Sequence, residues 1–206
     1  GLIVNEGKIV DASFVEVPKQ RNTKEENKTI KEGGIPESFQ KNKHKLAHKD
    51  VDAQWTSKNN TSYYGYKNHV KTDSKSKIIT KFVVTDASVH DSQPLEELLD
   101  SKDINEPLYA DSAYTGENQD MTIESREMLS EVSEKGYRNK PLTEVQKKNN
   151  TIKSKVRSRV EHIFGFMEMS MNGMYLYAIG EKRISGQIGL MNLTYNMFRK
   201  IQLQAI

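Results

Sequence analysis

Residues that favour β-strands and residues with helical periodicity occupy different parts of this chain, and this division restricts the fold more than any other feature. Runs rich in β-branched residues at 8–17, 61–72, 78–84 and 106–110 are short and bounded by turn formers, as strands are. The last third instead repeats apolar residues at intervals of three and four, which indicates amphipathic helices. Strands followed by flanking helices, with no internal repeat, predict a mixed α/β sheet layered by helices.

Local signals set the expected bounds of these elements. The first strand stops at Pro18, and a turn at residues 73–77 joins the next two strands into an antiparallel hairpin that extends the sheet. Asp91 or Ser92 is expected to cap a helix over residues 94–99, because short polar side chains satisfy free amides at a helix start. A helix from Thr115 to about Arg126 and a strand at 128–133 are also expected.

Two apolar stripes predict the C-terminal helices. We expect their methionines to fill the core, because a flexible thioether packs into irregular gaps. The first stripe comprises Val156, Val160, Ile163, Phe164, Met167 and Met171, and the second comprises Ile184, Ile188, Met191, Tyr195, Phe198 and Ile201.

Residues 18–60 differ in character from the rest of the chain, since Lys, Asn, Glu and Gln dominate them. A polar loop of this length inside a compact domain is usually functional or poorly ordered. We therefore expect a long basic insertion after the first strand, mobile in the absence of DNA. Trp55, the only tryptophan, is expected to pack at the rim of the core rather than to stack on a base.

Basic residues are concentrated in two runs that contain no acid. The net charge is only +3, but residues 147–159 carry six Lys or Arg, and residues 41–49 carry four Lys and two His. A solvated helix face would explain either run alone, whereas two such runs in a nearly balanced chain favour a phosphate backbone as the partner. The candidate DNA-contacting residues are Lys43, Lys45, Lys153, Lys155, Arg157 and Arg159.

Length and composition restrict the remaining classes of protein. A chain of 206 residues is most simply one domain, here residues 1–206, with enough length to bury a core. The chain has no cysteine, which excludes disulfides, zinc–thiolate sites and a thiol nucleophile and suits the reducing cytoplasm. No run is apolar enough for a membrane span, and no signal peptide is recognisable. Because Gly1 leads almost directly into a strand, we expect a fragment of a longer product.

Three acidic residues stand in contexts that favour a metal site. Asp11 and Asp111 each end a strand-like run, and Glu161 lies in a basic helical run. A carboxylate in a buried strand is costly unless it is paired or bound to a metal. Two strand ends and one helix can deliver carboxylates to a pair of divalent cations, a common arrangement for cutting phosphodiesters.

Each acid also has a plain structural explanation. Asp11 and Asp111 could face solvent or pair with a lysine. Glu161 could form an i, i+4 ion pair with Arg157, worth roughly a few tenths of a kcal/mol. His69 and His90 are expected to be structural, because a carboxylate site prefers hard ions with oxygen ligands.

Five segments resemble the insertion-sequence transposases that use an Asp-Asp-Glu triad, of the insertion-sequence-four/five type superfamily. They occur in that family's order and are residues 9–13, 62–70, 84–92, 109–116 and 157–165. The resemblance implies a ribonuclease-H-like mixed sheet flanked by helices, in which Asp11, Asp111 and Glu161 are catalytic and hold two Mg²⁺ or Mn²⁺ ions. It implies cleavage of transposon-end DNA and transfer of the freed 3′ hydroxyl into target DNA.

The same resemblance implies the partners and the setting. Double-stranded DNA would be bound by a homodimer, in a bacterial cytoplasm and on the nucleoid when bound. In that family an upstream helical segment often helps to bind the transposon ends, and this region is expected to be absent here. Some relatives surround the Glu with a Tyr-Arg-Glu-Lys pattern; Arg157 fits it, whereas Ser154 and Glu168 replace the Tyr and the Lys.

Two alternatives remain open from the sequence. One is a non-catalytic DNA-binding remnant of such a transposase, which would bind DNA in a salt-dependent manner without cutting it. The other is a metal-dependent nuclease of the same fold, which would hydrolyse DNA without joining strands.

Overall fold

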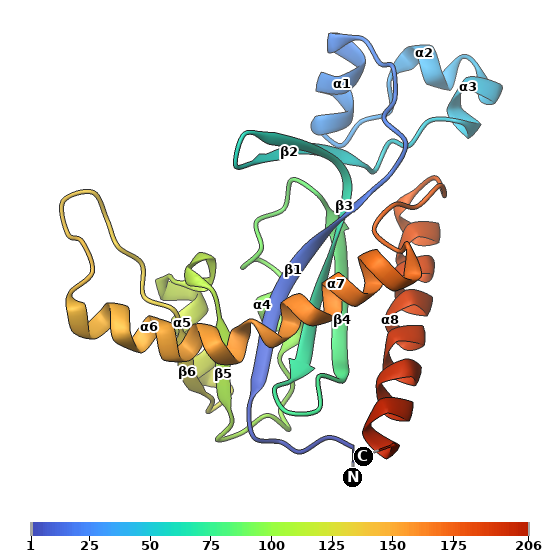
Figure 1. Ribbon diagram of the computed structural model, residues 1–206. Helices are drawn as coiled ribbons and strands as arrows, with labels where there is room; N and C mark the ends of the chain where they lie inside the picture. Colours follow the sequence, from blue (N-terminus) through green and yellow to red (C-terminus); the bar gives the residue numbers. More distant parts are fainter. Residues whose placement is uncertain (1, 206) are drawn as a thin grey trace.

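A computed structural model describes residues 2–205, and its centre is a six-stranded sheet (Figure 1). The strands are β1 (Lys8–Glu16), β2 (Gln54–Lys58), β3 (Thr61–Asp73), β4 (Ile79–Asp86), β5 (Pro107–Ala110) and β6 (Leu129–Val132). Gly65 of β3 pairs with both Glu16 of β1 and Gln54 of β2, so these strands lie on opposite edges of β3. β4 continues along the β2 edge, opposite residues 66–72.

The strand order and directions are those of a ribonuclease-H-like sheet. Through its main part the sheet runs β4-β3-β1-β5-β6. β1, β3 and β4 form an antiparallel meander, whereas β5 and β6 run parallel to β1. The predicted mixed α/β sheet flanked by helices is therefore confirmed.

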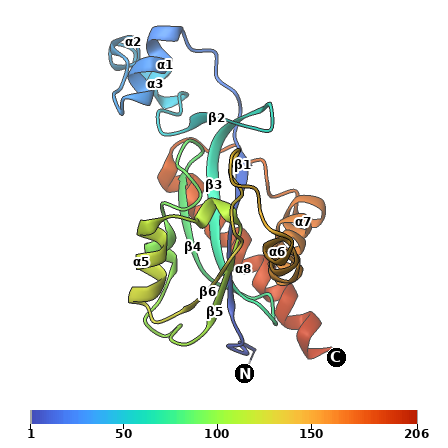
Figure 2. The same cartoon turned by 90° about the vertical axis from the view of Figure 1, so that its left-hand side faces the viewer.

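Helices cover both faces of the sheet (Figure 2). Because successive side chains of a strand point to opposite faces, neighbouring residues of β1 enter different cores. Ile9 packs with α7 (Arg159–Met171) and α8 (Glu181–Gln204). Val10 packs with α4 (Leu95–Leu98) and α5 (Glu117–Ser125). The first core includes Val70, Val160, Ile163, Met167, Ile184 and Ile188, and the second includes Leu95, Leu98, Leu108, Ile123 and Val132.

The first C-terminal stripe is divided between two helices rather than carried by one. α6 (Glu144–Arg157) ends where Ser158 adopts φ −56° and ψ −11°, and α7 begins at the next residue. The expectation of one unbroken helix from Val156 to Met171 was therefore wrong. The break places Arg157 at the end of one helix and Glu161 in the first turn of the next.

Residues 18–60 have more secondary structure than the predicted polar loop. They contain α1 (Lys24–Lys31), α2 (Glu37–Gln40) and α3 (Lys43–Ala47), which stand apart from the sheet in Figure 1, and they end in β2. A capping box at Thr23 begins α1, and the side chains of Ile30 and Phe39 are buried. Mobility of this insertion in the absence of DNA stays a prediction.

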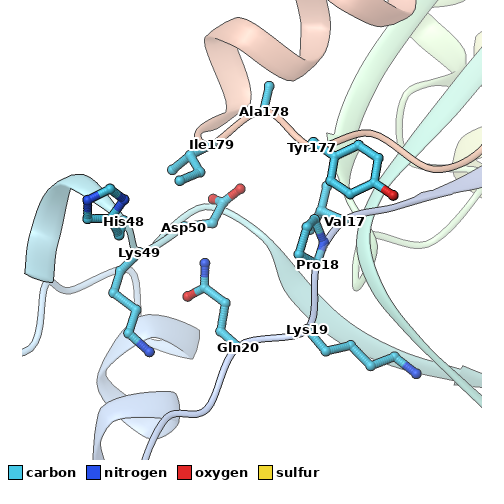
Figure 3. Close-up of a pocket in the computed structure, with 10 residues that line it drawn as sticks. All are labelled: Val17, Pro18, Lys19, Gln20, His48, Lys49, Asp50, Tyr177, Ala178 and Ile179. Carbon is cyan, nitrogen blue, oxygen red and sulfur yellow. The ribbon is translucent and has the colours of Figure 1, made fainter.

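Asp50 fastens the end of the insertion to the start of α8. Its Oδ1 accepts hydrogen bonds from the Tyr66 hydroxyl at 2.8 Å and from the Ala53 amide at 3.1 Å. Its Oδ2 accepts from the amide of Gly180, the residue before α8, at 3.1 Å. Figure 3 shows Asp50 beside Ala178 and Ile179 in a cavity of about 300 Å³.

Trp55 lies at the rim of the core, as expected. Its ring centroid is 4.9 Å from that of the buried Tyr64, and 43% of the residue is exposed. Among residues 2–205 no helix has the length and apolar character needed to cross a membrane.

Candidate active site

Asp11 lies inside β1 rather than at the strand end that the sequence predicts, and Asp111 is the residue directly after the neighbouring parallel strand β5. The register pairs Ile9 of β1 with Tyr109 of β5, and continuing it by two residues puts the two acids at the same level; the charge of Asp111 is near enough to raise the pKa of Asp11. By strand alternation both acids point to the face of Ile9 and Tyr109, which α6 and α7 cover. Asp111 also caps a 3₁₀ helix, η1 (Ser112–Tyr114), since its Oδ1 accepts from the Ala113 amide at 2.8 Å.

Arg157 connects the third acid to the first. Its Nη1 donates to Asp11 Oδ2 and its Nη2 donates to Glu161 Oε1, each at 2.9 Å. The structure therefore brings Asp11, Asp111 and Glu161 into one cluster, with the guanidinium of Arg157 between the strand acid and the helix acid. The i, i+4 pair expected as the plain explanation for Glu161 is present, and it belongs to the same cluster.

The environment of Asp11 disfavours its charged form. Burial raises the pKa of this carboxyl to about 6. The Ala12 amide, which donates to Oδ1 at 2.8 Å, and the charge of Arg157 act in the opposite direction, whereas the charge of Asp111 raises the pKa further. A group held at such a pKa between a like charge and a cation is typical of functional sites.

Tyr114 lies near both strand acids and near Asp91, and neither Tyr114 nor Asp91 was among the predicted site residues. Burial raises the pKa of Tyr114 well above its usual value, and the charges of Asp11, Asp91 and Asp111 add to the effect. The Tyr114 hydroxyl is buried and has no hydrogen-bond partner among residues 2–205. β4 runs parallel to β1, so the loop after β4 reaches the same end of the sheet; that topology is the signal that could have found Asp91.

The two histidines have structural contacts, as expected. The buried His69 shares a 2.9 Å hydrogen bond with the Thr85 hydroxyl, and burial lowers its pKa to about 4. His90 shares a 2.9 Å bond with the Ser92 hydroxyl.

The candidate DNA-contacting residues are less uniform than their sequence runs suggest. Lys153 donates to the Val132 carbonyl at 3.0 Å, and Arg159 donates to the Ser74 carbonyl at 2.8 Å. Lys45 pairs with Glu26 at 2.7 Å, whereas Lys43 and Lys155 are exposed. Four of the six candidate side chains, Arg157 among them, therefore make contacts within the protein, and DNA contact by the six residues stays a prediction.

The acid cluster has the right kind of ligand for a divalent cation, but its side chains are too far apart to share one. Carboxylate oxygens are the ligands that Mg²⁺ and Mn²⁺ prefer, and a cation would relieve both the burial of Asp11 and its repulsion from Asp111. Within residues 2–205, however, no group of three His, Cys, Asp or Glu side chains is close enough to hold a metal. Because the Arg157 guanidinium lies between Asp11 and Glu161, all three acids can share a metal only after it moves.

The acid cluster lies on a ribonuclease-H-like sheet, and comparison with known proteins gives the family. The model of the transposase DDE domain family matches residues 4–197, so the chain belongs to this family. The transposase for insertion sequence element IS1106 of Neisseria meningitidis serogroup B is 30% identical over 151 residues. That match covers 73% of this chain and about half of the relative. No solved structure matches the chain.

Proposed function

We propose that this chain cuts transposon-end DNA and joins the freed 3′ hydroxyl to target DNA, with Asp11, Asp111 and Glu161 as the catalytic acids. The observation that carries the proposal is the Arg157 bridge, which joins Asp11 and Glu161 beside Asp111. A strand, the residue after a second strand and a helix, all far apart in sequence, thus supply acids to one place. Membership of the transposase family and the name of the IS1106 relative support the same activity.

The three carboxylates would hold the divalent ions, Mg²⁺ or Mn²⁺. Such ions, when bound, supply activation of water and neutralisation of charge at the phosphodiester. The fold of the chain positions the three carboxylates. Asp11 lies in β1, Asp111 directly follows the parallel neighbour β5, and Glu161 lies in the first turn of α7. Phosphoryl transfer of this kind depends on positioning and charge more than on a protein nucleophile.

Arg157 has two roles in this proposal. Before DNA binds, it neutralises Asp11 and holds Glu161 in place. A guanidinium is also a bidentate donor to phosphate, so a DNA phosphate can replace the two carboxylates as the hydrogen-bond partner of Arg157. DNA binding would then leave the carboxylates of Asp11 and Glu161 free to bind the divalent ions.

The partner in this proposal is double-stranded DNA, both as transposon ends and as target. Two ends have to be processed together, which favours a homodimer on DNA in the bacterial cytoplasm. Exposed Lys43 and Lys155 are the first candidates for backbone contacts, because their ammonium groups are accessible.

The test uses the protein in its full encoded length with duplexes that carry the DNA flanking its gene. With Mg²⁺ the parent is expected to give nicked and joined products, whereas Asp11→Asn, Asp111→Asn and Glu161→Gln give neither and still bind DNA. Asp120→Asn, an exposed acid on α5, is the matched control and keeps parental activity. Parental cutting by Asp111→Asn would refute the assignment.

The products also separate the two alternatives. Nicks without joined strands indicate a nuclease of the same fold. Salt-dependent DNA binding with no metal-dependent cutting by the parent indicates a non-catalytic remnant.

A further inference from the structure

A cavity of about 290 Å³ opens beside the candidate active site. The residues that give it chemical character are Ser13, Phe14, Lys58, Tyr63, Lys67 and Asp91. It begins at Ala12, the residue after Asp11, whose amide donates to Asp11 Oδ1. Lys58 is near enough to Asp11 for its charge to lower the pKa of that carboxyl. Ala12 and Phe14 alternate with Asp11 along β1, so the cavity opens on the other side of the sheet from the Asp11 carboxylate, at the edge of β1 past its pairing with β5. A DNA strand that has one phosphate at Asp11 and continues around this edge reaches the cavity with its next nucleotide.

The lining of the cavity includes two ammonium groups and one carboxylate. Lys67 is nearly buried, and its Nζ lies 2.7 Å from Asp91 Oδ1 and donates to the Val89 carbonyl at 2.6 Å. Lys58, at the end of β2, is 55% exposed, and its Nζ is 3.8 Å from Asp91 Oδ2. The fixed Lys67–Asp91 pair is neutral, so the accessible Lys58 leaves this lining with one positive charge directed at solvent.

The lining of the cavity also includes a stacked pair of aromatic rings. Phe14 and Tyr63 stack with ring centroids 4.1 Å apart and planes inclined by 10°. The ammonium groups of Lys67 and Lys58 lie 5.2 and 5.9 Å from the centroid of Phe14. Flat rings beside ammonium groups match the two parts of a nucleotide, because bases stack on aromatic faces and phosphates attract ammonium groups.

We propose that this cavity binds the nucleotide next to the scissile phosphate, with its phosphate at Lys58 and its base against Tyr63. This inference rests on the proposed function, since it takes the cut strand to pass over Asp11. The Lys67–Asp91 pair holds the shape of the pocket, and Phe14 supports the Tyr63 ring from behind. The hairpin of β2 and β3 is thus a DNA-end contact, separate from the basic runs at 41–49 and 147–159.

The test measures the binding of fluorescein-labelled flanking duplexes by the full-length protein in EDTA, where no cutting occurs. One set of duplexes carries a single abasic site, and another a single neutral methylphosphonate, at each successive position near the cleavage site. Tyr63→Leu is expected to weaken binding of the intact duplex by about tenfold, the usual scale for one stacked base. An abasic site at one position should cause the same loss, with no further loss in combination with Tyr63→Leu.

Lys58→Gln is expected to weaken binding, and a methylphosphonate at the adjoining phosphate should cause no further loss in this variant. At every other phosphate the losses from the methylphosphonate and from Lys58→Gln should add. Lys102→Gln is the matched control, because Lys102 is an exposed lysine before the start of β5, at the opposite end of the sheet from Asp111. For Lys102→Gln, the loss of affinity caused by each abasic site or methylphosphonate should equal that of the parent. Additive losses at every position for both Tyr63→Leu and Lys58→Gln would overturn the pocket assignment.

Cutting assays with Mg²⁺ separate this proposal from the proposed function. A parent that cuts DNA but shows additive losses rejects the pocket alone. Non-additive losses with a parent that never cuts reject the catalytic proposal and keep the pocket. A parent that binds no duplex rejects both.

Discussion

Arg157 Nη1 donates a 2.9 Å hydrogen bond to Asp11 Oδ2, although 146 residues separate the two in the chain. The side chains are only 21% and 14% exposed, so salt screens this pair less than a surface pair. The guanidinium therefore links the end of α6 to β1, and a cation shared by Asp11 and Glu161 has to displace it.

Arg157→Gln is expected to destabilise the fold. The substitution leaves a partly buried carboxylate without its cation, which costs about 1–3 kcal/mol in the free energy of unfolding. Urea unfolding at pH 7 measures this loss. Lys155→Gln, an exposed neighbour on the same helix, should change stability by less than about 0.5 kcal/mol.

Mg²⁺ should raise the unfolding midpoint of Arg157→Gln more than that of the parent. A ligand that binds only the folded state stabilises it, and the vacated guanidinium position opens the acids to a cation. Equal Mg²⁺ responses in the two proteins would show that Arg157 does not compete with the metal.

Asp11→Asn is expected to make the protein more stable while it abolishes cutting. Because burial raises the pKa of Asp11 from 3.8 to about 6, the folded state holds this proton more tightly than the unfolded chain between these values. The contribution of Asp11 to stability therefore falls as the pH rises from about 4 to 6 and stays low above pH 6. At pH 7 the variant should gain on the order of 1–3 kcal/mol over the parent.

The pH dependence of the free energy of unfolding tests whether burial of the Asp11 charge causes the gain in stability. Below about pH 3.5 Asp11 is protonated in both states, so the advantage of Asp11→Asn should vanish. A variant less stable than the parent at pH 7 would mean that the Arg157 ion pair outweighs the burial of the charge.

Tyr114→Phe should leave stability unchanged or raise it by about 1 kcal/mol, because a buried hydroxyl without a partner costs free energy. Thermal unfolding compares it with Tyr66→Phe. Tyr66 donates to Asp50 at 2.8 Å, so its hydroxyl stabilises the fold and its removal should cost about 1–2 kcal/mol. A loss at Tyr114 as large as that at Tyr66 would show that its hydroxyl has a partner in solution.

The strands and the acids of the site could be predicted from sequence because their signals are local. Residues 8–17 are rich in β-branched residues and stop at Pro18, and Asp111 follows its strand directly, so both acids appear in the sequence within or next to a strand signal. Alternation and strand order then decide that both acids point to one face.

The parts that could not be predicted depend on contacts between distant segments. The break at Ser158 leaves the apolar stripe intact, so periodicity does not reveal it. Asp91 enters the site because β4 and β5 end on the same side of the sheet, and no local pattern marks that. The helices at residues 24–47 form in a polar segment with few apolar residues, among which Ile30 and Phe39 are buried.

Asp50→Ala is expected to loosen the join between the insertion and α8. Asp50 is 1% exposed, and its removal leaves the Tyr66 hydroxyl and the Gly180 amide without their acceptor. A negative charge at the start of α8 also interacts favourably with the helix dipole. Together these losses should cost about 3 kcal/mol in the free energy of unfolding and speed proteolysis between α3 and β2.

Asp52→Ala is the control for this prediction, because Asp52 also accepts a hydrogen bond at the start of α8. Its Oδ2 accepts from the Glu181 amide at 2.9 Å, but the residue is exposed, so solvent replaces the bond and the loss should stay near 1 kcal/mol. If Asp50→Ala and Asp52→Ala unfold at the same urea concentration, the buried network around Asp50 contributes no more than a helix cap. A loss confined to Asp50→Ala, with earlier cleavage near His48, would instead locate the weakened join at the α3–β2 segment.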